Sequence, residues 1–567
     1  MQAHAHCSLH CAPAPFRKRD RTLQGVSRTQ CAAQRDSRQQ EDSRLALVRV
    51  LLDASTAQLS ASASSAFDWL TSAVTAVTQL TQPLPPGFPP GPDGDVAIEL
   101  GTDPLALLTR VTARYGGAVG VKLAGARAVV VSDTQLARGV LIDDAAHYTK
   151  RGTAFFPGSV LTGEGLLVSD GEVWRRQRRL SNPSFRAAAV ASYATSMGMA
   201  AMSMTQPGGA WAQLSSYSSS TTIVRDVYPD FNDLTLQIVA TTLFGVDVRG
   251  PDAAEINAAI ADAFAFFATR ASQPPLLPEW VPTLDNVRLN AAVTRLDAAV
   301  YRLIAQRRRS RRDGSVESMP TADLLDRLLA SVDEDTGLGM TDKQLRDELM
   351  TLLVAGQETS AILLTWACSL LAQHPEAQSA VAAEAEAVLG ETRAPDAADY
   401  MKLHHAAAVV LETMRLMPPA YLVGRCADVD VQLGEHRLPK GTTLLVSPYI
   451  MHRSLAAWGA DATEFRPQRW FTRTDADGAA TVNVNEALKG MGKNDAYIPF
   501  GAGPRNCIGT GFALMEAVLV LAALSRRARF RVPPGQAPPQ PAALLTLRPA
   551  AARLELSKRA QVVQTHQ

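Results

Sequence analysis

One loop near the C-terminal end of the chain constrains its structure and chemistry more than any other feature. Residues 500–509 read FGAGPRNCIG and place Cys507 in a glycine-rich turn, directly before an apolar, helix-like run. Glycines let the backbone turn tightly enough to direct several N–H donors at one sulfur atom, and such donors stabilise a thiolate. The loop therefore predicts that Cys507 is a metal ligand. The alternative is a small buried hydrophobic side chain, which an isolated cysteine usually is.

Composition limits the remaining choices. The chain has 567 residues, of which 46% are hydrophobic, and no clear linker divides residues 95–555, so we expect one large domain there. A formal net charge of +1 argues against a nucleic-acid partner. The other cysteines form no CxxC pair and no zinc spacing, which favours a reducing compartment over a disulfide framework.

The N-terminal region is rich in arginine and poor in acidic residues, which is typical of an organellar transit peptide; a disordered leader is the alternative. No run approaches the roughly 20 apolar residues of a spanning helix. Residues 66–80 carry an apolar helical stripe that would suit either a membrane surface or the body of the protein. A proline-rich hinge follows at 83–94. We therefore predict a leader at 1–60, an amphipathic segment with the hinge at 61–94, the catalytic domain at 95–555 and a C-terminal tail at 556–567.

Within the domain, helical patterns dominate and strands are short, which predicts a mainly α fold with small β-sheets (α+β). The longest helix runs from 341 to about 372 and begins at a capping box of Thr341 and Gln344. Further expected elements are strands at 119–123, 128–131, 429–433 and 442–446 and a second helix at 397–417.

The middle of the longest helix contains an unusual polar segment, AGQETS, at residues 355–360. Ala355 and Gly356 leave space beside the helix, while the hydroxyl of Thr359 can bond back to the helix or hold a water molecule. Glu358 can relay protons. This segment predicts a reaction site rather than plain core packing; the alternative is a polar kink satisfied by helix contacts.

These motifs, in this order, resemble the cytochrome P-450 family of haem-thiolate enzymes over about residues 95–555. The resemblance implies the cytochrome P-450 fold, with Cys507 as the axial ligand of the haem iron and with Phe500 in the same ligand loop. Within the family, the stretches at 342–351, 452–454 and 512–517 are similar to the plastid carotenoid-ring hydroxylases.

The resemblance also implies which side chains hold the haem carboxylates. Trp174 and Arg178 lie one helical turn apart, and with Arg425 and Arg505 they would bind the two propionates. A guanidinium group suits this task because its fork matches a carboxylate.

Three further charged residues acquire a structural role from the resemblance. Glu412 and Arg415 share a helix face, and with Arg469 they would form a buried network. The basic residues near Trp174 would be either a solvated face or a docking rim for an acidic electron carrier; these are Arg175, Arg176 and Arg179.

The implied substrate pocket is the part with the fewest sequence signals. The expected contacts lie in the polar segment of the longest helix, in a loop before Trp174 and in a mid-chain helix. They are Ala355, Gly356, Phe155, Phe156, Leu161, Phe264, Phe266 and Phe267.

The activity implied is insertion of one atom of O₂ into an unactivated C–H bond of an apolar substrate, for which we take a carotenoid or another lipid. Haem b would be the cofactor. Electrons would come from an external NAD(P)H- or ferredoxin-linked donor, a ferredoxin or a reductase, because no flavin or nicotinamide fingerprint follows the haem domain. The leader favours the chloroplast, with another organelle or a membrane-peripheral location as the alternative.

Three other functions stay open from the sequence. A haem-thiolate isomerase or dehydratase would act on fatty-acid hydroperoxides, but such relatives usually lose the acid–threonine pair that Glu358 and Thr359 form. A haem sensor would not turn over. In the third alternative the Cys507 loop would be a structural feature without haem.

Overall fold

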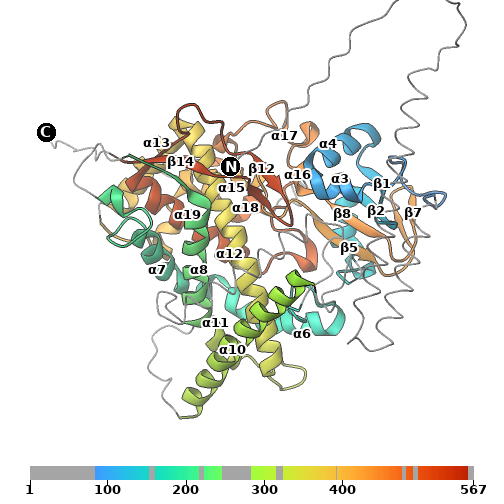
Figure 1. The fold of residues 1–567 in the computed structure, drawn as a ribbon, viewed down its shortest axis with the longest axis horizontal. Coiled ribbons are helices and arrows are strands. Elements are labelled where there is room, and N and C mark those ends of the chain that lie inside the picture. The colour runs from blue at the N-terminus through green and yellow to red at the C-terminus, as the bar shows by residue number, and fades with distance from the viewer. Residues whose placement is uncertain are drawn as a thin grey trace, which may run out of the picture. The chain divides into compact units, whose positions relative to one another are not determined.

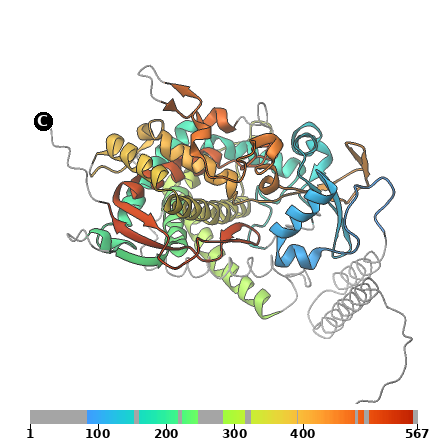
Figure 2. The same cartoon turned by 90° about the horizontal axis from the view of Figure 1, so that it is seen from above.

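Helix α12 (Asp342–Gln373) is the longest element, and other helices surround it (Figures 1 and 2). It begins at the predicted capping box, in which the Thr341 side chain accepts the Gln344 N–H and the Gln344 side chain accepts the Thr341 N–H. Its 32 residues span roughly 48 Å. The predicted helix at 341–372 is therefore confirmed.

The computed structural model describes residues 83–151, 153, 160–215, 222–245, 283–313, 323–390, 392–474, 480–488 and 496–559. The expected leader, the amphipathic stripe and the aromatic candidates Phe155, Phe156, Phe264, Phe266 and Phe267 lie outside the described residues.

Helices account for most of the described secondary structure, and the fold class is mainly α with small sheets, as predicted. Besides α12, the described α-helices are α3 (Ala97–Thr102), α4 (Pro104–Tyr115), α5 (Thr134–Arg138), α6 (Gly171–Ser181), α7 (Ala187–Ser203), α8 (Val227–Phe244), α10 (Leu284–Arg312), α11 (Leu324–Ala330), α13 (Pro375–Leu389), α14 (Ala397–Tyr400), α15 (His404–Leu416), α16 (Pro448–Met451), α17 (Leu455–Trp458), α18 (Val484–Leu488) and α19 (Thr510–Arg527).

The largest sheet has five strands in the order β1-β2-β8-β5-β3, and only the pair β2–β8 is parallel. A three-stranded sheet has the order β11-β14-β4, and the pairs β6–β7, β9–β10 and β12–β13 stand alone. Strand bounds are β1 (Ala118–Leu123), β2 (Ala126–Val131), β3 (Tyr148–Thr149), β4 (Thr222–Asp226), β5 (Val423–Ala427), β6 (Val431–Leu433), β7 (His436–Leu438), β8 (Thr443–Val446), β9 (Arg473–Thr474), β10 (Ala480–Thr481), β11 (Ala528–Arg531), β12 (Pro541–Ala543), β13 (Leu547–Pro549) and β14 (Arg553–Lys558).

The first predicted hairpin is confirmed. Strands β1 and β2 pair antiparallel through a two-residue turn, Ala124 and Gly125, whose φ angles are 50° and 83°. Positive φ at both central residues is the turn geometry that matches the twist of hairpin strands. The strands expected at 429–433 and 442–446 are present as the shorter β6 and β8.

The single helix predicted at 397–417 is wrong, because the segment divides into α14 and α15. The cause is a contact from another helix. The Glu384 carboxylate of α13 accepts the backbone N–H groups of His405 and Ala406 at 2.8 and 3.1 Å. A side chain of α13 therefore caps the first turn of α15. The sequence of the segment carries no sign of this contact.

The main hydrophobic core lies between α12 and its neighbours α7, α8, α13, α15 and α19. Helix α12 is also long and apolar enough to cross a membrane, with a mean hydropathy of 1.2 in its best window. Of that window, 72% is buried within the protein, as expected for the central helix of a core. The five-stranded sheet lies to one side of these helices, where the blue N-terminal elements mark it (Figure 2).

Candidate active site

The Cys507 loop is closed by its own backbone and by contact with a neighbouring segment. The Cys507 N–H donates to the Phe500 carbonyl at 2.9 Å, and a short 3₁₀ turn (Gly503–Arg505) precedes the cysteine. Gly503 has a φ of 69°, and a Cβ placed on it would lie 1.9 Å from the Leu141 carbonyl oxygen. Only glycine fits there. The loop thus holds Cys507 just before the first turn of α19.

The sulfur of Cys507 is surrounded by donors and positive charge. Burial raises the pKa of the thiol, while the Gly509 N–H, the Arg178 charge, the Thr510 hydroxyl and the Lys150 charge all lower it. The side chain nevertheless keeps an exposed surface. A thiolate at a helix N-terminus among N–H donors and cations is well placed to bind a metal, which would displace the thiol proton.

Two of the predicted propionate-binding residues stack against each other. The Arg505 guanidinium lies over the Trp174 ring, 4.2 Å from its centre. Arg505 also forms an ion pair with Asp170, yet its Nη1 atom is buried without a hydrogen-bond partner. Arg178, one turn after Trp174 on α6, donates to the Asn506 carbonyl at 3.0 Å.

The cations beside the Cys507 loop outnumber the carboxylates. Arg425 lies on β5, is 4% exposed and donates to the Gly424 carbonyl at 2.8 Å. Burial, and then the charge of Arg505, lower the pKa of Arg425 to about 10. Burial, then Arg425 and Arg505, lower the pKa of Lys150 to about 7. Buried cations with so little compensation fit an anionic ligand. Asp170 is the one carboxylate among the groups that shift both pKa values.

Lys150 is a residue that the sequence analysis missed. It directly follows β3, and the pairing of β3 with β5 brings it close to Arg425. No local sequence motif records this contact. The unpartnered Arg505 atom, the crowded cations and the thiolate loop together fit an iron porphyrin, which carries two carboxylates and takes one axial sulfur.

The middle of α12 is accessible although the turns before and after it are buried. Val354, Ala355, Gly356, Glu358 and Thr359 are half-buried, between fully buried turns. The Thr359 hydroxyl donates to the Ala355 carbonyl at 2.7 Å, so it bonds back to its own helix.

Two contacts from α8 shape the same stretch. The Thr235 hydroxyl of α8 donates to the Gln357 carbonyl at 2.9 Å. A Cβ on Gly356 would lie 3.3 Å from a methyl group of Val239, so packing against α8 also requires a small residue. Leu161, a candidate pocket residue, is 2% exposed and packs in the core cluster that includes Leu352 and Leu353.

Two carboxyl groups lie at the positions next to Thr359, Glu358 directly and Glu516 through its hydrogen bond with Ser360. Burial raises the pKa of Glu358, whose Oε1 atom accepts the Thr546 hydroxyl at 3.0 Å. Burial also raises the pKa of Glu516 to about 8; this carboxyl accepts the Ser360 hydroxyl at 2.5 Å. The sequence analysis did not identify Thr546 or Glu516, because they reach α12 only through the tertiary fold.

Glu412, Arg415 and Arg469 lie in one buried network. Arg415 donates twice to the Glu412 carboxylate, at 2.9 and 2.8 Å, and Arg469 donates at 3.0 Å. Trp470 and the Arg466 N–H add further donors at 3.0 and 2.9 Å. The Glu412 and Arg415 side chains are fully buried. The network connects α15 to the segment that leads toward the Cys507 loop.

The basic rim has partners of its own. Arg175 pairs with Glu172, and Arg179 pairs with Asp333 and Asp335. Arg176 donates to the Leu338 and Gly339 carbonyls, both at 2.9 Å. These contacts reduce the free positive charge of this face.

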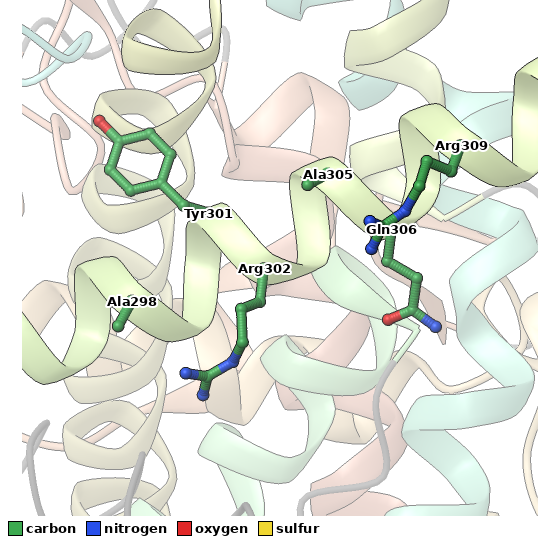
Figure 3. A pocket seen from close by; sticks show the side chains of 6 residues that line it. All are labelled: Ala298, Tyr301, Arg302, Ala305, Gln306 and Arg309. Atoms are coloured by element: carbon green, nitrogen blue, oxygen red, sulfur yellow. The ribbon is translucent and has the colours of Figure 1, made fainter.

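A separate hollow of about 500 Å³ lies along α10 (Figure 3). Its described lining comes from one helix face and contains no residue of α12 or of the Cys507 loop. The residues are Ala298, Tyr301, Arg302, Ala305, Gln306 and Arg309.

A cysteine loop before one core helix, buried cations beside it and an accessible acid–hydroxyl pair in a second core helix are the features expected of a haem-thiolate protein. The family comparison makes this specific. The chain belongs to the cytochrome P-450 family, whose profile matches residues 85–556.

The chain has relatives in bacteria and in plants. The chain is 33% identical to cyclooctatin synthase of Streptomyces melanosporofaciens, over 80% of this chain and 91% of the relative. It is 32% identical to the protein LUTEIN DEFICIENT 5, chloroplastic, of Arabidopsis thaliana, over 75% and 69%. It is 31% identical to pentalenene oxygenase of Streptomyces avermitilis, over 80% and 93%.

Solved structures agree on the fold. A crystal structure of a cytochrome P-450 haem domain superposes with a TM-score of 0.69 at 23% identity and covers 83% of this chain and 98% of that chain. As a member of this family the chain is a monooxygenase, with haem, O₂, a substrate and an external electron donor implied.

Proposed function

We propose that this chain is a plastid monooxygenase that hydroxylates an unactivated carbon of a carotenoid or a related apolar lipid. The proposal rests on two features that occur together. They are the Cys507 loop before α19 and the accessible neighbours Glu358 and Thr359 in α12. The likeness to a chloroplastic protein and to enzymes named for pentalenene and cyclooctat-9-en-7-ol supports an apolar ring substrate.

Haem b, when bound, supplies the activation of dioxygen and the attack on the C–H bond. Cys507 would provide the sulfur ligand, and the donors and cations around it favour the thiolate against the effect of burial. Trp174, Arg178, Arg425 and Arg505 would bind the carboxylates of the cofactor, and the Phe500 carbonyl closes the ligand loop by accepting the Cys507 N–H. These assignments rest on the charge and packing described above.

The residues of α12 hold protons and leave space for the reactants. Ala355 and Gly356 are small and leave room beside the helix. Burial raises the pKa of Glu358 and so favours its protonated form, and we assign this carboxyl group the role of proton donor. The Thr359 hydroxyl orients that transfer, and the network around Glu412 holds the ligand side of the site rigid.

Substrate-binding difference spectra test the substrate class. A β-ring carotenoid should convert the ferric spectrum to the high-spin form and be hydroxylated when a ferredoxin and its reductase supply electrons. A cyclic terpene and a fatty-acid hydroperoxide serve as the other two ligands. Hydroxylation of the terpene alone would replace the carotenoid by a terpene substrate, and rearrangement of the hydroperoxide without reductant would overturn the monooxygenase assignment.

The chloroplast location and the soluble electron donor belong to the same proposal. Import of residues 1–60 fused to a reporter into isolated chloroplasts, with removal of the leader, is the expected result. Flotation of the purified chain with vesicles tests peripheral membrane association. A leader that stays cytosolic would contradict the plastid location.

A further inference from the structure

The C-terminal hairpin reaches α12 at the residue to which we assign proton delivery. Strands β12 and β13 are joined by residues 544–546, at the end of which lies Thr546. Its hydroxyl donates to Glu358 Oε1 at 3.0 Å, across a sequence separation of 188 residues. The Tyr228 side chain of α8 also hydrogen-bonds to this carboxyl group. The hairpin therefore provides one of the contacts that hold Glu358 in place.

The hairpin is itself anchored on both sides of Thr546. The Tyr421 hydroxyl donates to the Leu544 carbonyl at 2.6 Å, and the Trp366 Nε1–H donates to the Leu547 carbonyl at 2.9 Å. Both aromatic residues are 2% exposed. The Leu547 N–H donates to the Pro419 carbonyl at 2.9 Å. Buried hydrogen bonds of this kind fix a loop closely, so the position of Thr546 relative to α12 is determined by the fold.

Two further polar side chains face Glu358, one from each neighbouring element. Tyr228 comes from the first turn of α8, and Arg548 comes from β13. Both act on Glu358 in the direction opposite to burial, and Arg548 also hydrogen-bonds to Tyr228. Both side chains are half-buried, so each has a surface in contact with solvent. Glu358 is thus connected to two polar side chains that are partly open to solvent.

We propose that the β12–β13 hairpin is the positioning element for Glu358 and, with Tyr228, forms its proton inlet. Thr546 orients the carboxyl group, and Arg548 with Tyr228 lines the route by which a proton from water replaces the one that Glu358 releases. This inference rests on the proposed monooxygenase function and adds residues that act through Glu358.

The proton balance is simple. The Thr546 hydroxyl hydrogen-bonds to Oε1, so the acidic proton resides on the other oxygen of Glu358. When Glu358 releases that proton toward Thr359, the carboxylate left behind is stabilised by the Thr546 hydroxyl and by the permanent charge of Arg548. One proton from bulk water then restores the acid, and no electron passes through these residues.

Paired variants separate a positioning role from a structural one. Thr546→Val and Arg548→Gln should lower the product formed per electron consumed at least tenfold and raise hydrogen peroxide release. Thr546→Ser and Arg548→Lys should restore at least half of the coupling, because each keeps the hydroxyl or the charge. Tyr301→Phe on α10 and Arg531→Gln on β11 are matched controls and should couple as the wild type does. The ferrous carbonyl spectrum confirms in each variant that the haem-thiolate site has assembled.

A second measurement needs no turnover. The infrared band of the protonated Glu358 carboxyl group is identified by its loss in Glu358→Gln. Thr546→Val should shift this band, and Arg548→Gln should raise the pH at which it disappears, because the Arg548 charge lowers the pKa of Glu358. An unmoved band together with unchanged coupling in both variants would overturn the inference while leaving the monooxygenase assignment intact. A band that responds in an enzyme without any oxygenase activity would support the positioning role and refute the proposed function.

Discussion

Two buried glutamates on neighbouring helices show two different uses of a carboxyl group. Glu412 on α15 accepts five hydrogen bonds, from Arg415, Arg469, Trp470 and the Arg466 N–H. Glu358 on α12 has two side-chain partners, Thr546 and Tyr228, and burial raises its pKa. Five donors hold the first group in one position. Partial compensation leaves the second group able to hold and release a proton.

The comparison of the two glutamates predicts the largest effect on stability at Glu412. Arg415→Met would leave the Glu412 carboxylate buried without its main partner, and we expect unfolding to become easier by about 3–5 kcal/mol. Chemical denaturation with matched haem-retention measurements would show this. Arg531→Met, at an exposed position of β11, is the control. A loss below about 1 kcal/mol in Arg415→Met would contradict the structural role of the network.

At Glu358 we expect a large effect on activity and a small effect on stability. Glu358→Gln keeps the shape of the side chain but cannot release a proton, so product formation should fall roughly 100-fold or more. Stability should change by about 1 kcal/mol or less, because few hydrogen bonds are lost. Steady-state rates, peroxide release and a denaturation curve measured on one preparation test both parts. Full activity in this variant would remove Glu358 from proton delivery.

Glu516 sharpens the comparison through its pH dependence. Its pKa rises from an ordinary value of 4.5 to about 8 on folding, because it is buried with the Ser360 hydroxyl as its one favourable partner. Between these values the folded state holds a proton that the unfolded state has released, so wild-type stability falls as the pH rises. Glu516→Gln removes this dependence. Its stability relative to wild type should therefore increase from pH 5 to pH 8, by at most about 1.4 kcal/mol per pH unit.

Denaturation curves at several pH values measure that difference. Glu172→Gln provides a control carboxyl group on the surface, and its difference from wild type should not vary over the same range. A Glu516→Gln difference that is flat with pH would show that the carboxyl group is charged in the folded protein.

The smallest effect is expected where the charges are exposed. Glu172 and Arg175 form an ion pair whose side chains are 81% and 58% exposed. Water and salt screen such pairs, so Arg175→Gln should change stability by about 0.5 kcal/mol or less. Thermal unfolding at low and high salt tests this. A larger loss would show that α6 depends on its surface charges.

Sequence reasoning succeeded where a signal is local. The capping box before α12 and the β1–β2 turn are written in consecutive residues, and both were found in the predicted places. The residues of the Cys507 loop are also close together in the sequence, and their types were enough to indicate the family. The sequence-based prediction of one helix at 397–417 was wrong, because the start of α15 depends on Glu384, which lies on another helix.

The sequence alone indicated the family, the candidate ligand Cys507 and the acid–hydroxyl pair of Glu358 and Thr359. These follow from residue types at fixed short spacing, and local spacing can be read from a sequence. The tertiary structure decided the surroundings of these residues. It brought Lys150 beside Arg425 through strand pairing, Glu516 against Ser360 through helix packing and Thr546 onto Glu358 through the C-terminal hairpin. Contacts between residues more than a hundred positions apart arise from the packing of whole elements, and no local pattern records them.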